Sequence, residues 1–248
     1  MAIITAENEI ARLRRSGQIL AAALRQTAAA VEPGITTAEL NAIADASIRA
    51  AGGVPSFIGY NGYPAALCTS INDEVVHGIP STERALAAGD IIGLDLGVIF
   101  EGMFTDHAVT VGVGKISRDD QRLLQDTKAS MMAGITAAVV GQRIGDISAA
   151  VEAALKPRGY GIIRQLTGHG VGRAIHEEPS IPNFGKAKTG PMIVPGLVIA
   201  IEPMVALGGW EVETAADGWT MATIDGSRAA HFEHTVLVTE GGPEIITA

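Results

Sequence analysis

The first third of the chain has apolar residues at helical spacing. Glu7–Val31 is rich in Ala, Leu, Arg and Gln and is followed by a Pro-Gly pair, a pattern typical of an amphipathic helix with a defined end. Thr36–Glu39 has the sequence of a capping box, which predicts a second helix that runs through Arg49 and ends at Gly52-Gly53.

The pattern changes from helix to strand at residue 54. Residues 54–114 are β-rich and punctuated by glycine, and they contain two apolar runs, Ile91–Phe100 and Phe104–Val113. Glu101-Gly102 between the two runs is a turn signal. The segment therefore predicts a long β-hairpin.

The same succession of helices and strands then occurs again. We expect one helix over Ser117–Val140, capped by Ser117, and another over Gly145–Leu155. Strands are expected around Val198–Val205, Thr220–Ile224 and Phe232–Val238. The repetition, with no linker between the copies, predicts one α+β domain over 1–248, with duplicated halves of about 1–114 and 115–248.

Composition narrows the class of protein. The chain has 248 residues, of which 47% are hydrophobic, and 18 basic against 27 acidic residues give a net charge of −9 with no basic run. Binding nucleic acid or anionic lipid is therefore not expected as its main role. The longest apolar stretch, Met131–Val140, is too short to span a membrane, and Glu7 and Glu9 argue against a cleavable signal. A single cysteine, Cys68, excludes an internal disulfide and suits a reducing compartment, so we expect a cytoplasmic protein, and nothing demands more than a monomer.

Two aspartates lie within the predicted hairpin. If the chain folds back at Phe100-Glu101, Asp95 faces Asp106 directly, with Cβ atoms ~4.5–5.5 Å apart. Two ionised carboxylates at that separation repel unless one is protonated or a cation lies between them. A single aspartate in a strand usually faces solvent, but two facing aspartates in such apolar strands favour a metal ion.

Three further residues carry candidate metal-ligating groups. His169 lies in the glycine-rich segment 168–172, although a buried histidine often only satisfies hydrogen bonds. Glu202 ends one apolar strand and Glu233 lies in another. A buried carboxylate needs a cation, an arginine or a proton, and Arg228 is the nearest candidate for a salt bridge.

Four carboxylates and one imidazole make an oxygen-rich ligand set with enough negative charge for two divalent ions. The set is Asp95, Asp106, His169, Glu202 and Glu233. Two such ions polarise a carbonyl group and lower the pKa of water. The chemistry that this set predicts is hydrolysis of an amide or an ester.

With these residues in this order, the chain resembles the methionine aminopeptidases of type I, in their short bacterial form. The resemblance runs from about Ile10 to Ile246 and depends on several motifs taken together. These are Gly59–Pro64, Cys68–Pro80, Leu94–Gly97, Gly168–Gly172, His176–Pro179, Ile201–Met204 and Phe232–Thr235. It implies the duplicated pita-bread fold, with an antiparallel sheet flanked by helices. It also implies removal of the initiator methionine from nascent proteins when the second residue is small, and transient proximity to the ribosome.

The resemblance also implies roles for individual residues. All five ligand candidates would hold two divalent ions (Co, Mn, Fe or Zn), with Asp106 and Glu233 bridging them, and Glu202 would also handle the proton of the attacking water. His77 would contact the scissile amide or the substrate amine and His176 the substrate carbonyl. The methionine side chain would be held by Tyr60, Tyr63, Cys68 and Trp219, since aromatic and thiol groups suit a thioether.

Three positions depart from the family pattern. Phe57 and Ile175 occupy pocket positions where a small residue or Cys and a Phe, respectively, are common. His107 stands where Thr is usual, and we expect its side chain to point away from the ligands because neighbours in a strand alternate faces.

Three other functions are less consistent with the sequence. An X-Pro aminopeptidase or prolidase of the same fold carries an extra N-terminal domain, for which 248 residues leave no room. A type II enzyme carries an insertion between its two glutamates, and Glu202 and Glu233 are too close for one. A binding protein that has lost the metal ligands is disfavoured because all five are present.

Overall fold

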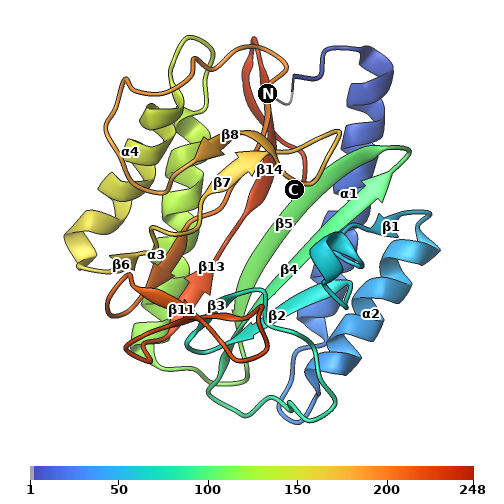
Figure 1. Ribbon diagram of the computed structural model, residues 1–248, viewed down its shortest axis with the longest axis vertical. Helices are drawn as coiled ribbons and strands as arrows, with labels where there is room; N and C mark the ends of the chain where they lie inside the picture. The colour runs from blue at the N-terminus through green and yellow to red at the C-terminus, as the bar shows by residue number, and fades with distance from the viewer. Residues whose placement is uncertain (1–2) are drawn as a thin grey trace.

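The computed structural model describes residues 3–248. Met1 and Ala2, the first residues of the expected domain, lie outside the described part. Figure 1 shows a helix pair on either side of a central β-hairpin. No helix within residues 3–248 is long and apolar enough to cross a membrane.

The four predicted helices are present. They are α1 (Glu7–Ala29), α2 (Thr37–Ala50), α3 (Arg118–Ala137) and α4 (Ile144–Leu155). The predicted capping box forms, since Thr36 Oγ1 accepts from the Glu39 amide at 3.2 Å and Glu39 Oε2 accepts from the Thr36 amide at 2.8 Å. Ser117 caps α3 by accepting from the amide of Asp120 at 3.0 Å.

The predicted hairpin is formed by β4 (Ile91–Phe100) and β5 (Met103–Gly112), but the predicted register is wrong. Phe100 pairs with Met103, so Asp106 pairs with Gly97 and Asp95 pairs with Ala108. The turn is the two-residue Glu101-Gly102, with both φ angles positive at 47° and 80°, as a type I′ hairpin turn requires. Asp95 and Asp106 are therefore diagonal neighbours on one face of the sheet, not direct partners.

The remaining strands are short. They are β1 (Val54–Pro55), β2 (Leu67–Ile71), β3 (Glu74–Val76), β6 (Gly161–Ile162), β7 (Gly168–Gly170), β8 (Glu177–Ile181), β9 (Val198–Ile201), β10 (Met204–Ala206), β11 (Val212–Thr214), β12 (Met221–Thr223), β13 (Ala229–His231), β14 (His234–Thr239) and β15 (Gly242–Ile245). One sheet has the order β1-β4-β2 with β5 on β4, and another has the order β15-β14-β9-β7-β8. Two smaller sheets have the orders β13-β10-β6 and β11-β12-β3.

Two of the predicted strands differ from the observed ones at a glutamate: one is interrupted there and the other begins only after it. The expected strand Val198–Val205 breaks between β9 and β10 at Glu202-Pro203, because proline has no N–H for a ladder bond. The expected strand Phe232–Val238 begins only at His234, so Phe232-Glu233 lies between β13 and β14. Both glutamates are thus placed where the chain changes from one sheet to another.

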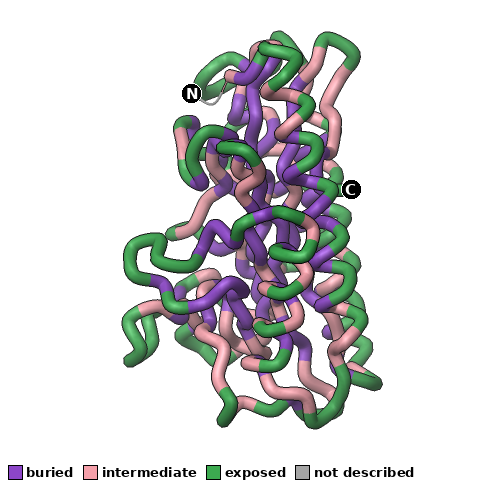
Figure 2. Tube along the Cα trace, turned by 90° about the vertical axis from the view of Figure 1, so that its right-hand side faces the viewer, coloured by how far each residue is buried: buried purple, intermediate pink, exposed green. Residues whose placement is uncertain are grey.

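The two larger sheets join along β5 and β14. Thr235 Oγ1 accepts from the Asp106 amide and donates to the Asp106 carbonyl oxygen, both at 2.8 Å. The Glu233 amide donates to the Ala108 carbonyl oxygen at 2.9 Å. Buried residues run along the middle of the molecule in Figure 2, between exposed outer turns. This junction positions Asp106 and Glu233 in the interior.

Candidate metal centre and active site

A cavity of about 380 Å³ opens at the junction of the sheets. Each of the eleven residues that the sequence nominated as a ligand, a catalytic group or part of the substrate pocket lines it. They are Tyr60, Tyr63, Cys68, His77, Asp95, Asp106, His169, His176, Glu202, Trp219 and Glu233. The structure therefore gathers in one place residues that span more than 170 positions of the chain.

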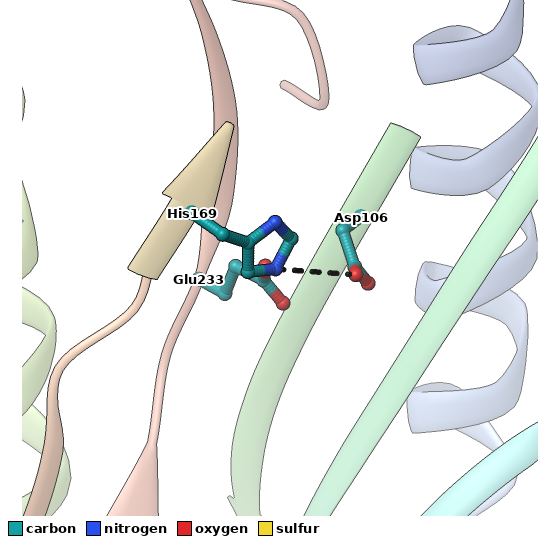
Figure 3. A group of neighbouring side chains, drawn as sticks. All are labelled: Asp106, His169 and Glu233. Carbon is teal, nitrogen blue, oxygen red and sulfur yellow. Dashed lines mark ion pairs between the residues drawn. The ribbon is translucent and has the colours of Figure 1, made fainter. Parts of the chain in front are cut away.

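Three of the candidate ligands converge at the floor of the cavity. Donor atoms of Asp106, His169 and Glu233 all lie within 4.8 Å of one another. Figure 3 shows the His169 ring, from β7, directed at the Asp106 carboxylate on β5, with Glu233 beside them. Residues from three separate segments thus offer one nitrogen and two carboxylates to a common point.

The protonation of His169 suits a metal ligand. Its Nδ1 lies 2.9 Å from the carbonyl oxygen of Gly170, which can only accept, so Nδ1 carries the proton. Burial lowers the pKa of His169 to about 3, so the ring is neutral and Nε2 presents a lone pair. That lone pair faces Glu202 Oε1 at 3.3 Å and Asp106 Oδ2 at 3.9 Å. A lone pair that faces carboxylate oxygens is favourable when a cation lies among them or when a carboxyl group is protonated.

The carboxylates of the cavity also indicate a cation. Burial raises the pKa of Asp106, Glu202 and Glu233, and for Asp106 and Glu233 the neighbouring carboxylates raise it further. Asp95 Oδ1 and Glu233 Oε1 are buried with no hydrogen-bond partner among the described residues. The nearest predicted salt-bridge candidate, Arg228, instead pairs with Asp120 at 2.8 Å and donates to the Gly89 carbonyl oxygen. These residues fit divalent ions, whose charge would stabilise the ionised carboxylates.

Asp95 and Glu202 lie at the edge of this donor group. Burial raises the pKa of Asp95 to about 6. The Glu202 backbone is fixed by Asn183, whose Nδ2 donates to the Glu202 carbonyl oxygen at 3.0 Å. Both side chains line the same cavity as the other three, so a set of four carboxylates and one imidazole is present.

The two nominated catalytic histidines flank the cavity and are neutral. Burial lowers the pKa of His77 to about 4, and it also lowers that of His176. His77 follows β3 with a φ of 61°, a left-handed conformation that is uncommon outside glycine and is often found at functional sites. His176 Nδ1 lies 2.8 Å from the Tyr60 hydroxyl, and its ring lies 4.3 Å from that of His169 between centroids.

An aromatic wall borders the cavity. The Tyr63 hydroxyl donates to the Gly78 carbonyl oxygen at 2.9 Å, and its ring contacts Trp219 edge to face at 5.1 Å between centroids. Cys68 is buried beside them, where burial raises the pKa of the thiol. Phe57 lines the cavity, whereas Ile175 packs in the same apolar cluster without lining it. Of the two unusual pocket residues, only Phe57 is thus placed to contact a substrate.

His107 lies on the opposite face of β5, as predicted. Its ring stacks on His234 at 4.3 Å between centroids and lines a separate cavity of about 390 Å³. Its Nδ1 contacts the Glu233 carbonyl oxygen. His107 therefore supports the backbone of a ligand candidate from behind rather than adding an imidazole to the cavity.

The sequence analysis missed His231. This histidine is 3% exposed, lines the cavity and lies with Nε2 3.6 Å from Glu202 Oε2. A signal was available, because residues two apart in an extended chain share a face and His231 precedes Glu233 by two. Thr235, which fixes the Asp106 backbone, follows Glu233 by the same interval.

The sequence and the fold of the chain are both similar to those of known metallopeptidases. The chain matches the metallopeptidase family M24 over residues 11–240, and it belongs to that family. Its fold is the α+β pita-bread fold of these metallopeptidases, as predicted.

Within that family, its relatives are methionine aminopeptidases. The methionine aminopeptidase of Clostridium acetobutylicum is 45% identical over 247 residues, covering 100% of this chain and 99% of the relative. Methionine aminopeptidase 1 of Mycobacterium tuberculosis is 46% identical over 245 residues, covering 96% and 92%. The crystal structure of the methionine aminopeptidase from Thermotoga maritima has a TM-score of 0.98 at 40% identity, covering 100% and 99%.

A prolidase shares the fold at a greater distance. The prolidase from Pyrococcus furiosus has a TM-score of 0.79 at 23% identity, and the matched region covers 100% of this chain but only 66% of the prolidase. This likeness shows the common fold alone.

Proposed function

We propose that this protein is a metal-dependent methionine aminopeptidase that removes the N-terminal methionine of nascent proteins and peptides when the second residue is small. The observation that carries the proposal is one cavity that joins a carboxylate–imidazole donor group to a wall of Tyr63, Cys68 and Trp219. Such a wall suits a thioether through dispersion and sulfur–aromatic contact. Full-length relatives named methionine aminopeptidase agree with it. The limit to a small second residue comes from the resemblance of the chain to methionine aminopeptidases.

We propose Asp95, Asp106, His169, Glu202 and Glu233 as ligands of two divalent ions, with Asp106 and Glu233 shared between them. Bound ions of Co, Mn, Fe or Zn would polarise the scissile carbonyl and lower the pKa of the attacking water. Four carboxylates supply up to four negative charges, which match two divalent ions better than one.

The protein groups around the metal site have separate tasks. Glu202 would accept the proton of the attacking water, because its carboxylate lines the cavity and lies 3.3 Å from the His169 nitrogen of the proposed metal site. With the Tyr60 hydroxyl donating to Nδ1, the neutral His176 would carry its proton on Nε2 and donate it to the substrate carbonyl. The neutral His77 contacts the scissile amide or the substrate amine from the other side.

We further propose that the chain is one catalytic domain built from halves of about 1–114 and 115–248. Each half contributes a helix pair and strands of one larger sheet. The protein is proposed to act as a cytoplasmic monomer near ribosomes, where nascent chains emerge. Its single free cysteine is compatible with a reducing compartment.

The direct test is release of methionine from the peptide Met-Ala-Ser. Purified protein is stripped with a chelator, and activity is measured after adding Mn²⁺, Co²⁺, Fe²⁺ or Zn²⁺ separately. We expect release only with metal, weaker release from Leu-Ala-Ser, and no cleavage of Ala-Pro. Stoichiometric metal binding without release under any ion would refute the proposal, and preferential cleavage of Ala-Pro would favour prolidase activity.

A further inference from the structure

One polar atom in the active-site cavity has no partner and no assigned role. His231 Nε2 is buried and makes no hydrogen bond with any described residue. The residue as a whole is 3% exposed. An unsatisfied buried imidazole nitrogen is unfavourable, so the site requires an acceptor or a ligand that meets it.

The backbone of His231 fixes where this side chain points. Thr110 Oγ1 donates to the His231 carbonyl oxygen and accepts from the His231 amide, both at 2.9 Å. His231 also pairs with Met204 in the ladder between β13 and β10. The hydrogen bonds of the backbone are thus made independently of the ring, which lines the cavity.

Glu202 lies between two imidazoles. Its Oε1 is 3.3 Å from His169 Nε2, and its Oε2 is 3.6 Å from His231 Nε2. The two rings present different groups to Glu202. His169 Nε2 presents a lone pair. A proton on His231 Nε2 has no other acceptor among the described residues. When Oε1 shares a metal ion with His169, Oε2 is the oxygen left free to handle a proton.

We propose that His231 is a positioning residue, whose Nε2–H donates to Glu202 Oε2 in the metal-loaded enzyme and so fixes the carboxylate with one oxygen on the metal and the other toward the attacking water. We expect the separation of 3.6 Å to shorten to a hydrogen bond in the metal-loaded enzyme, since catalytic hydrogen bonds often tighten only when the site is complete. His231 acts through Glu202 and does not itself bind the ion. The inference rests on the proposed aminopeptidase function.

Two substitutions distinguish the effect of the His231 hydrogen bond from the effect of its side-chain volume. His231→Leu removes the donor at similar volume, and His231→Gln keeps an N–H at about the reach of Nε2. We expect His231→Leu to lower kcat on Met-Ala-Ser by about 10- to 100-fold, with KM changed by less than about 3-fold, as is typical for partners of metal ligands. His231→Gln should recover kcat to within about 3-fold of the original protein. If His231→Leu does not fold, His231→Asn replaces it, because its amide is too short to reach Glu202 and the same loss is expected.

Metal binding gives a readout that is independent of turnover. Titration calorimetry of the stripped protein with Mn²⁺ should show the same number of ions in all His231 variants, with affinity about 10-fold weaker in His231→Leu and restored in His231→Gln. In a Glu202→Ala background, His231→Leu should leave the affinity unchanged, because the acceptor of the proposed hydrogen bond is already gone.

Three results would overturn the assignment. Loss of one bound ion in His231→Leu would make His231 a ligand. Equal kinetics for the Leu and Gln variants would show that no hydrogen bond is involved. An effect of His231→Leu that persists in the Glu202→Ala background would show that it does not act through Glu202. Absence of methionine release by the unsubstituted protein under every metal would refute the aminopeptidase function instead, and the calorimetric test of His231 would still apply.

Discussion

Asp106→Asn tests the central claim that the cavity holds carboxylates that repel one another and that bound cations stabilise. Asp106 is 4% exposed, and Asp95 and Glu202 both raise its pKa. Asparagine keeps nearly the same shape, and its Oδ1 can still accept from the His107 amide, as Asp106 does at 3.1 Å. The substitution therefore removes a charge and little else.

The expected change in stability can be worked from this environment. A like-charge pair at about 4 Å is unfavourable by about 4 kcal/mol at an effective dielectric constant of 20, and protonation of the empty site relieves part of it. We expect Asp106→Asn to raise the unfolding free energy of the metal-free protein by about 1–3 kcal/mol. For a chain of this size each kcal/mol shifts Tm by about 2–4 °C, so Tm should rise by about 5 °C. The metal-loaded variant should lose most of its stabilisation by Mn²⁺ and at least about 100-fold in kcat, since metal ions contribute several kcal/mol to such reactions.

Asp120→Asn is the matched control. Asp120 is 3% exposed, but its carboxylate pairs with Arg228 at 2.8 Å. Removing this charge should lower Tm by about 5 °C, because a charge-assisted hydrogen bond is lost. The increase in Tm on addition of Mn²⁺ should be unchanged. Thermal unfolding with chelator and with Mn²⁺ measures both variants. If metal-free Asp106→Asn is destabilised as much as Asp120→Asn, the carboxylates of the cavity do not repel one another and the argument fails.

Three further predictions follow from the same geometry. His77→Ala should lower kcat strongly while elemental analysis still finds both ions, and loss of an ion would instead make His77 a ligand. In the metal-free protein, burial raises the pKa of Asp95 from 3.8 to about 6, so between these values Asp95 binds more protons in the folded state than in the unfolded state. The contribution of Asp95 to stability, measured with chelator as the Tm of the original protein minus that of Asp95→Asn, should therefore fall as pH rises from about 4 to about 6, and a rise in this difference would contradict the reasoning. Gly97→Ala should destabilise the fold by about 1–3 kcal/mol in chemical denaturation, because its Cβ would lie 2.0 Å from Ser56 Oγ. Unchanged stability would show that β1 can move away from β4.

The helices and the hairpin were predictable because local rules decide them. The capping box at Thr36 and Glu39 and the cap at Ser117 form as expected, since each uses atoms within one turn of helix. The hairpin turn at Glu101-Gly102 was also visible in the sequence. Its register was predicted wrongly because the closing point was placed one residue too early, although the two aspartates still share a face.

The sequence predicted which chemical groups form the site, but not how these groups are arranged. Glu202 and Glu233 were identified because a carboxylate in an apolar run needs a compensating partner, and Arg228 could not be excluded as that partner from the sequence. The structure excludes it by pairing Arg228 with Asp120. The breaks in the chain at both glutamates, which carry them between sheets, also depend on long-range pairing that no local pattern encodes.

The sequence by itself thus determined the helices, the hairpin and the family, and it nominated the candidate metal ligands, because these depend on local spacing and side-chain chemistry. Only the tertiary structure decided which donor atoms converge, which His169 nitrogen faces the carboxylates, and that His231 lies beside Glu202. These outcomes depend on contacts between segments such as β5, β7 and β14, which lie far apart along the chain. Their relative positions are set by sheet pairing and packing, to which every part of the core contributes.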